Sequence, residues 1–306
     1  GPVDPPKPEE FSIKVEKRIT SDTTGIKDGS EVKYEVKVTN NTQKDLSLHD
    51  LVIWDVMDSG LTMVMENGQP KDAEFTVTGN DGNTNRVAYK GSVAQENGKT
   101  AYYWQLSGEF KRGAVVTLTY TDVVSNSGYD KITLYNIAYA TGYTTAKAEQ
   151  PTAKAAAFSA VYSSAMQLTR NGFNPSDLFD EDRDSVTGSS GAGTGAGGSG
   201  GTSIDVEGKL CVVTFNPNGG KWDDHDTTKS VEVKKNETVG GKMPAGPAQV
   251  GSHFKGWNTR DDGSGTAFNE NTIITSDVTV YAQWEEHSFT REDADKWVTG
   301  PDCITD

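Results

Sequence analysis

The sequence predicts an all-β protein of two modules, an antiparallel β-sandwich joined by a glycine-rich linker to a smaller β module. Short runs of alternating apolar and polar residues fill much of the chain, and turn-forming residues separate them. Alternation with a period of two is typical of half-buried strands, and many short strands without helical periodicity favour a sandwich. Residues 187–203 are almost wholly Gly, Ser, Thr and Ala. Such a stretch cannot bury enough apolar surface to offset its backbone entropy, so we expect a flexible spacer there.

The distribution of charge sets the expected boundaries of the modules. The 306 residues include 29 Lys and Arg against 44 Asp and Glu, which gives a formal charge of −15. Most of this excess lies in three segments, which we interpret as solvated connectors. They are an N-terminal linker or engineered remnant at 1–10, an acidic and then Gly/Ser-rich linker at 170–208, and a C-terminal tail at 286–306. The folded modules are then expected at 11–169 and 209–285.

The first module shows the strand pattern in order along the chain. Residues 11–19 and 32–38 alternate apolar and polar side chains. Further β-rich runs lie at 48–56, 74–78, 101–106, 114–121, 132–140 and 155–167. The turns between the runs are marked by Asp28-Gly29, Asn40-Asn41, Asn67-Gly68, Asn80-Asp81-Gly82-Asn83 and Asn97-Gly98. This order of strands and turns predicts an antiparallel sandwich.

Three polar residues interrupt the apolar faces of these strands. Lys17, Asp55 and Asn136 each lie in phase with the apolar residues of their own run, whereas the competing Lys14 is out of phase. Because a lone buried charge is costly, polar residues on inward faces should meet. A desolvated Lys becomes neutral and nucleophilic, and a protonated Asp can polarise the carboxamide of Asn. The three residues together permit a Lys–Asn isopeptide bond, formed with loss of ammonia.

Three segments of this module resemble a known family. Residues 53–62 (IWDVMDSGLT) are similar to the D-x-L-P-x-G-L-T stretch of Gram-positive surface repeats and isopeptide-forming pilin domains. Residues 34–40 (YEVKVTN) and 135–138 (YNIA) are similar to the Y-x-V-x-V-x-N strand and the N-x-A segment of the same family. The resemblance covers most of residues 11–169 and implies an Ig-like fold.

The same resemblance implies roles for the three polar residues. Lys17 and Asn136 would be the linked pair, and Asp55 would be the catalytic acid. Two positions depart from the family pattern, since Met57 replaces the usual Leu and Asp58 replaces the usual Pro. The alternative is purely structural: Lys17 reaches a sheet edge, Asp55 caps a turn, and Asn136 bonds to the backbone.

The second module contains three strand candidates, at 212–220, 231–239 and 278–284, and its segment 254–257 is followed by a turn-rich stretch. Their order and spacing resemble the internalin B-repeat, or Listeria–Bacteroides repeat, whose members read V-x-F-x-x-N-G-G, then F-x-G-W, then D-x-T-L-Y-A-x-W. The resemblance implies a small, mostly β module similar to the β-grasp. Trp257 and Trp284 are expected to pack in its core, and the alternative is an exposed platform for a glycan.

Cysteine and metal chemistry have little support in the sequence. Cys211 and Cys303 are the two cysteines; they could form a disulfide if the tail folds back, or remain thiols. Residues 180–184 begin like a calcium loop, but the later ligand positions of such a loop are not filled. We therefore expect no metal site and no cofactor.

The composition and motifs also restrict the function. An acidic chain is a poor partner for nucleic acid or anionic lipid, and no apolar run is as long as a membrane span. The sequence contains no nucleophile elbow, P-loop, zinc motif or dinucleotide fingerprint, so we expect no enzyme beyond a single-turnover self-linking reaction.

The two resemblances predict a structural or adhesive region of an extracellular Gram-positive protein at the cell wall or cell surface. This region would belong to a larger parent with neighbouring domains, and its candidate partner would be a host protein or a glycan. The alternative is an accessory or ligand-binding region of a large secreted enzyme.

Overall fold

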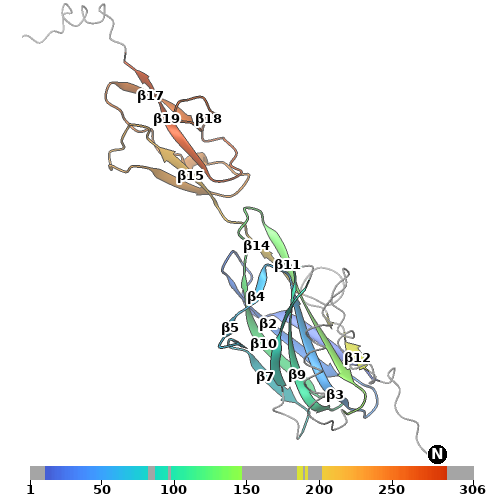
Figure 1. Ribbon diagram of the computed structural model, residues 1–306. Coiled ribbons are helices and arrows are strands. Elements are labelled where there is room, and N and C mark those ends of the chain that lie inside the picture. Colours follow the sequence, from blue (N-terminus) through green and yellow to red (C-terminus); the bar gives the residue numbers. More distant parts are fainter. Residues whose placement is uncertain are drawn as a thin grey trace, which may run out of the picture. The chain divides into compact units, whose positions relative to one another are not determined.

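The structure divides into two compact units built of strands. The computed structural model describes residues 11–81, 87–95, 98–146 and 202–287, together with the backbone of 185–188 and 190–191. The first unit comprises Gly1–Ser127 and Lys131–Glu207, and the second comprises Gly128–Asp130 and Gly208–Asp306. Strands dominate both units (Figure 1), and the one helix among the described residues is a 3₁₀ turn at Gly240–Lys242. The predicted all-β fold class is therefore confirmed.

Two sheets form the first unit. One sheet has the order β13-β1-β2-β10-β4, with β7 also paired to β10. Its strands are β1 (Ile13–Ile19), β2 (Glu31–Asn40), β4 (Leu61–Met63), β7 (Glu74–Thr78), β10 (Val115–Val124) and β13 (Ser190–Gly191). All these pairs are antiparallel except that of β1 with β13, which is parallel. A two-stranded ribbon of β5 (Met65–Glu66) and β6 (Gln69–Pro70) lies outside both sheets.

The second sheet has the order β12-β11-β3-β9-β8, with β14 also paired to β11, and is wholly antiparallel. Its strands are β3 (Leu48–Met57), β8 (Val87–Ala94), β9 (Thr100–Phe110), β11 (Ile132–Tyr143), β12 (Ser185–Gly188) and β14 (Thr202–Val206). The strand β8 was not foreseen in the sequence, and the run expected at 155–167 lies outside the described residues.

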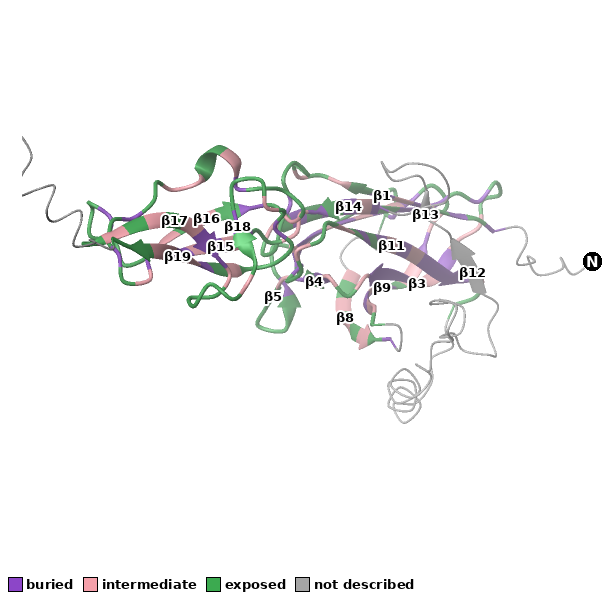
Figure 2. Ribbon diagram, turned by 90° about the horizontal axis from the view of Figure 1, so that it is seen from above, coloured by how far each residue is buried: buried purple, intermediate pink, exposed green. Residues whose placement is uncertain are grey.

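The core of the first unit lies between these two sheets (Figure 2). Side chains alternate between the two faces of each strand, and every second one points into the core. Tyr34 and Val36 on β2 pair with Tyr120 and Leu118 on β10, and all four are almost fully buried. The second sheet contributes side chains of its own, of which Trp104 on β9 is fully buried and stacks on Tyr120. The central aromatic residues therefore come from strands that are far apart in the sequence.

Strand β3 is buried on both faces. Ile53 belongs to the core between the sheets, whereas its neighbours Val52 and Trp54 belong to a separate apolar cluster with Val56 and Ala101. Trp54 is fully buried there, and its ring stacks on that of Tyr103 at a centroid separation of 4.5 Å. A strand covered on both faces reads as a nearly continuous apolar run, which is the pattern of residues 51–57.

The expected linker at 170–208 contains three strands, so that prediction needs correction. Residues 185–188, 190–191 and 202–206 all pair with strands of the first unit. In β14, Thr202, Ile204 and Val206 are buried in alternation, and the two aliphatic residues join the core of the sandwich. The Gly- and Ser-rich composition hid this strand, because a strand on a sheet edge needs only its backbone ladder and a few alternate apolar side chains.

The second unit contains a five-stranded mixed sheet in the order β16-β15-β19-β17-β18. Its strands are β15 (Cys211–Asn216), β16 (Lys229–Val233), β17 (Ser252–Asn258), β18 (Ala267–Phe268) and β19 (Val278–Glu286). The central pair β15 and β19 is parallel, and the other pairs are antiparallel. The strand expected at 231–239 is shorter than predicted and ends at Val233.

Aromatic side chains fill the core of the second unit. Phe215 packs edge-on against Trp257, and Trp222 stacks on the same Trp257 ring at a centroid separation of 6.2 Å. Trp257 is buried, as expected for a core residue, and Trp284 lies against this core with its Nε1 donating to the carbonyl of Asn218 at 3.0 Å. The two tryptophans are therefore packing residues of the unit.

Truncating the buried side chain of β14 tests whether this strand is part of the sandwich. Ile204→Ala should lower the free energy of unfolding of the first unit by about 2–5 kcal/mol, because it removes buried methyl groups. The exposed neighbour Asp205 provides the control, and Asp205→Ala should change that free energy by less than about 1 kcal/mol. Urea unfolding of the full chain, followed by hydrogen exchange of β11, measures both. If both substitutions changed the free energy of unfolding equally and only slightly, residues 202–206 would belong to the linker and not to the sandwich.

A glycine pair tests the packing of the second unit. A Cβ at Gly220 would lie 2.4 Å from Cζ2 of Trp284, whereas a Cβ at Gly241 meets nothing within 4 Å. Gly220→Ala should therefore destabilise the unit by about 1–3 kcal/mol through overpacking. Gly241→Ala should change the free energy of unfolding of the unit by less than about 0.5 kcal/mol. Hydrogen exchange of β15 and β19 compares the two variants, and equal protection would contradict the close contact of Gly220 with Trp284.

Candidate functional site

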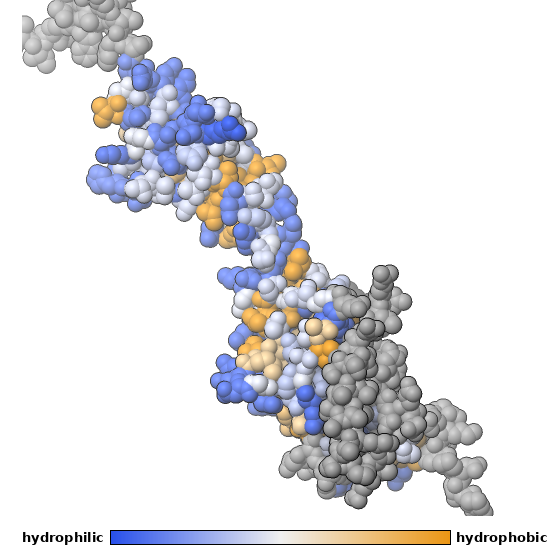
Figure 3. All heavy atoms as spheres, viewed as in Figure 1, coloured by the Kyte–Doolittle hydropathy of each residue, from blue (hydrophilic) through white to orange (hydrophobic). Residues whose placement is uncertain are grey.

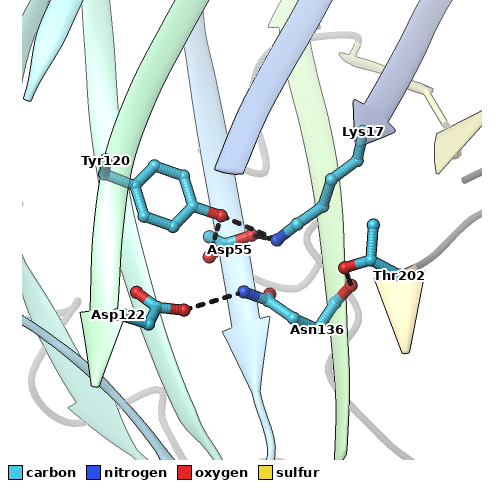
Figure 4. A network of polar contacts seen from close by, with 6 residues as sticks. All are labelled: Lys17, Asp55, Tyr120, Asp122, Asn136 and Thr202. Atoms are coloured by element: carbon cyan, nitrogen blue, oxygen red, sulfur yellow. Dashed lines mark hydrogen bonds and ion pairs between the residues drawn. The ribbon is translucent and has the colours of Figure 1, made fainter. Parts of the chain in front are cut away.

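Three strands of the sandwich carry the candidate residues into the core. Lys17 lies on β1, Asp55 on β3 and Asn136 on β11, and none of them is more than 1% exposed. Each side chain points inward because it shares the phase of the apolar residues on its strand. On β11, Asn136 stands two residues from Ala138, which pairs with Asp55 across the ladder. Figure 4 shows the three side chains converging with Tyr120 and Asp122 of β10.

Lys17, Asp55 and Tyr120 form a closed set of polar contacts. The Nζ of Lys17 is ion-paired with Oδ1 of Asp55 and donates to the hydroxyl of Tyr120 at 2.7 Å. The hydroxyl of Tyr120 in turn donates to Oδ2 of Asp55 at 2.5 Å. Both oxygens of Asp55 are therefore occupied, one by the lysine and the other by the tyrosine.

Burial of Lys17 disfavours the charged form of its side chain. Burial lowers the pKa of Lys17 below its ordinary value, and the charge of Asp55 opposes part of that change. The Nζ also lies 4.8 Å from the ring centroid of Tyr34 and 5.4 Å from that of Tyr120, so aromatic faces line the rest of its surroundings. A lysine in this position can pass a proton to the carboxylate that it touches.

Asn136 contacts a second acid, Asp122. Its Nδ2 donates to Oδ2 of Asp122 at 3.2 Å, and its backbone carbonyl accepts from the hydroxyl of Thr202 at 3.1 Å. Among the described residues, neither Oδ1 of Asn136 nor Oδ1 of Asp122 has a hydrogen-bond partner, and both atoms are buried. The carboxamide is thus held by one of its two ends.

Asp122 and Tyr120 are site residues that the sequence prediction missed, and Asp122 is the one that contacts Asn136. Asp122 is fully buried, and burial together with the nearby charge of Asp55 raises the pKa of Asp122 well above its ordinary value. The signal was present in the sequence, since Asp122 is in phase with Leu118, Tyr120 and Val124 on one strand. The predicted strand ended at residue 121, one position too early to include it.

The structure contradicts the purely structural roles that the sequence left open for all three of these residues. Lys17 does not reach a sheet edge, because its side chain is fully buried against Asp55. Asp55 does not cap a turn, because it lies within β3 and pairs with both β11 and β9. The side chain of Asn136 donates to an acid and not to the backbone.

The other candidate sites find less support. Cys211 is buried at the start of β15, and Cys303 lies outside the described residues, so their disulfide stays a prediction. Within the described ranges, no three His, Cys, Asp or Glu side chains gather as metal ligands, and no helix is long and apolar enough to cross a membrane.

Large apolar side chains on the surface are scattered over both units. Figure 3 shows apolar areas interrupted by hydrophilic residues on the visible face. The exposed large apolar residues are Met65, Phe75, Tyr135, Leu210, Val250 and Ile273. They come from separate strands and loops of the two units, so they do not define one docking face among the described residues.

Comparisons with known proteins place one part of the chain in a family of repeats. The family model of the Listeria–Bacteroides repeat domain matches residues 212–283, which confirms a repeat of this type in the second unit. A search of curated proteins finds no match to the sequence.

Several solved structures share a likeness with the chain. SpaA, the major pilin of Corynebacterium diphtheriae, is 14% identical with a TM-score of 0.36, over 70% of this chain and 43% of SpaA. The D312A variant of BcpA, the major pilin of Bacillus cereus, is 10% identical with a TM-score of 0.36, over 90% of this chain and 67% of BcpA. The Actinomyces fimbrial adhesin FimA is 13% identical with a TM-score of 0.33, over 89% of this chain and 100% of FimA. The chain thus spans less than half of SpaA, and these scores are too low to establish a common fold.

Removing one or both ionic partners tests the electrostatics of the buried pair. Lys17→Met leaves the Asp55 carboxylate buried without its cation, and Lys17→Met/Asp55→Asn removes both charges. The double variant should be more stable than the single variant by about 3 kcal/mol, because an uncompensated buried charge is the costly state. Neither variant can form a bond through residue 17, so covalent linkage does not enter the comparison.

The exposed Lys14 of the same strand is the control for this comparison. Lys14 is ion-paired with Glu16 at 2.7 Å on the surface, so Lys14→Met should change the free energy of unfolding by less than about 1 kcal/mol. Urea unfolding of the full chain provides the values. A double variant that is no more stable than Lys17→Met would show that Asp55 does not carry an uncompensated charge.

Proposed function

We propose that this chain is a non-enzymatic structural or adhesive region of a bacterial cell-surface protein, whose sandwich is stabilised by a self-formed isopeptide bond between Lys17 and Asn136. The observation that carries the proposal is the buried polar network that joins Lys17, Asp55, Tyr120, Asp122 and Asn136 inside an apolar core. A buried ion pair is a weak source of stability, because desolvation offsets most of the attraction between its charges. Stability alone therefore does not explain why the core contains this polar network, whereas a chemical reaction between its residues does.

The chemistry needs a neutral amine, an electrophilic carboxamide and a carboxylate that takes the proton of the amine. Burial lowers the pKa of Lys17, and Asp55 is in direct contact to accept its proton. The neutral Nζ then attacks Cγ of Asn136, and ammonia leaves as the new amide forms. The reaction occurs once in each chain and turns over no substrate.

The bond would join the two sheets of the sandwich. Lys17 is on the sheet of β1 and β2, and Asn136 is on the sheet of β11 and β3. A cross-link that closes a loop of this length stabilises a fold by roughly 4–5 kcal/mol in the chain-entropy model. Tension that enters through β1 would pass to β11 through the bond, without loading the strands between them.

The second unit supports a location at the cell surface. Its match to the Listeria–Bacteroides repeat agrees with the sequence resemblances of both modules, which belong to Gram-positive surface proteins. We infer an extracellular location at a Gram-positive cell wall, neighbouring domains in a larger parent protein, and a host protein or glycan as the partner. Cell fractionation of the source organism with an antibody against the second unit tests the location.

Intact mass under denaturing conditions tests the isopeptide bond. With cysteines reduced, the chain should be lighter than its sequence mass by one ammonia, because linkage expels Nδ2 of Asn136. Lys17→Ala and Asn136→Ala should each restore the full mass expected for the substituted chain. Asp55→Ala should fold but remain unlinked, since the acceptor of the Lys17 proton is gone.

Lys14→Ala is the matched control, because Lys14 lies three residues away on the same strand and is exposed. It should keep the mass deficit of the parent chain. A parent chain at its full sequence mass would refute the bond, and an Asp55→Ala chain with the deficit would remove Asp55 from the mechanism.

A further inference from the structure

The buried network contains two acids, and the reaction has two separate tasks for an acid or base. We propose that Asp122 is a second catalytic residue, the acid that donates to the carbonyl oxygen of Asn136, while Asp55 takes the proton of Lys17. This inference rests on the proposed isopeptide bond and deepens it.

The contacts divide the two acids between the two reactants. Asp55 has one oxygen on Lys17 and the other on Tyr120, so both its oxygens are engaged away from Asn136. Asp122 is the carboxyl group that touches the side chain of Asn136, at 3.2 Å from Nδ2. Among the described residues, Asp122 is therefore placed to act on the carboxamide and Asp55 to act on the amine.

The unpartnered atoms indicate which form Asp122 takes. A carboxylate oxygen that is buried without any donor is costly, whereas the carbonyl oxygen of a neutral carboxyl group is much less so. Oδ1 of Asp122 is buried in this way. Burial and the charge of Asp55 also raise the pKa of Asp122, which keeps the proton on this group. Asp122 therefore has a hydroxyl group to donate.

A half-turn of the carboxamide brings its oxygen to that hydroxyl. The oxygen and nitrogen of an Asn side chain have nearly the same shape, so rotation about the Cβ–Cγ bond exchanges them without needing more space. After rotation, Oδ1 of Asn136 takes the place from which Nδ2 now contacts Asp122. The oxygen that lacks a partner then accepts from Asp122, and this hydrogen bond makes Cγ more electrophilic.

The sequence of proton transfers balances with these two acids. Lys17 passes one proton to the Asp55 carboxylate, and the free amine forms a bond to Cγ while Oδ1 takes the proton of Asp122. One further proton passes from Nζ to Nδ2. The C–Nδ2 bond then breaks, ammonia leaves, and the proton on Oδ1 returns to Asp122. The products are a neutral amide, ammonia, a protonated Asp55 and a regenerated Asp122.

The rate of linkage in newly made chains tests this role. Full-length chains are made in a short pulse of cell-free synthesis, denatured at intervals and weighed intact, so that the fraction lacking one ammonia is followed in time. Asp122→Asn retains the shape of the side chain but cannot transfer a proton, and Asp122→Leu cannot donate at all. Both variants should link about 10²–10⁴-fold more slowly than the parent chain, the usual contribution of a general acid.

The neighbouring residue Thr121 gives a control on the same strand. Thr121 is buried, and its side chain forms no hydrogen bond with the described residues of the network, so Thr121→Val should link at the parent rate. Hydrogen exchange of β10 and β11 establishes that each variant is folded. If Asp122→Asn loses protection from hydrogen exchange, the linkage rate of Asp122→Leu decides the result. If both variants lose this protection, Asp122 is needed for folding and the proposal is overturned.

The outcomes separate this inference from the proposed function. A parent chain that loses ammonia, with both folded Asp122 variants linking as fast as Thr121→Val, would overturn the role of Asp122 and leave the bond intact. A parent chain that never loses ammonia would overturn both. Loss of ammonia in the parent with slow linkage in the Asp122 variants supports both.

Discussion

The ion pair of Lys17 with Asp55 is the contact on which the arrangement of the first unit depends. A lysine that is fully buried needs an acceptor at a fixed place, and Asp55 and Tyr120 supply it from β3 and β10. The pair therefore fixes both the position of β1 in its sheet and the register of β1 along β2. A slip of β1 by one residue along β2 would turn Lys17 toward solvent, bring Glu16 or Arg18 inward, and leave Asp55 without a cation. The polar network thus adds a penalty to wrong registers that the alternation of apolar residues on β1 already disfavours.

Much of the site could be predicted from the sequence because it depends on local alternation. The inward direction of Lys17, Asp55 and Asn136 follows from the phase of each strand alone, and the structure buries all three. Their contacts could not be predicted in the same way. Tyr120 is 103 residues from Lys17 and 65 from Asp55, and the pairing of such distant strands depends on sheet order. Asp122 obeys the same phase rule, and was missed only because the predicted strand ended one residue early.

The boundary between the units shows where composition misleads. A stretch rich in Gly and Ser has little apolar surface to bury, and this is true of the mean composition of the predicted linker. It fails for Thr202–Val206, in which Ile204 and Val206 alternate with polar residues and the backbone pairs with β11. Five residues with two inward aliphatic side chains are enough for a strand when an established sheet offers an edge. The second unit posed no such difficulty, because its aromatic residues lie at the spacing of a repeat and meet in one core.

The proposed bond also explains why two acids are compatible with a stable core. Before the reaction, the core holds a charged pair, which is the costly state of such a network. The proposed reaction would replace the ammonium of Lys17 with a neutral amide and leave Asp55 protonated, so the buried charges would disappear. The new amide still has an N–H and a carbonyl that need partners in a dry interior. Asp55 is placed to accept from the N–H, and Asp122 is placed to donate to the carbonyl. In this proposal the two groups that promote the reaction would also satisfy its product, and for that reason neither could be exchanged for an apolar residue without leaving a buried polar atom unpaired.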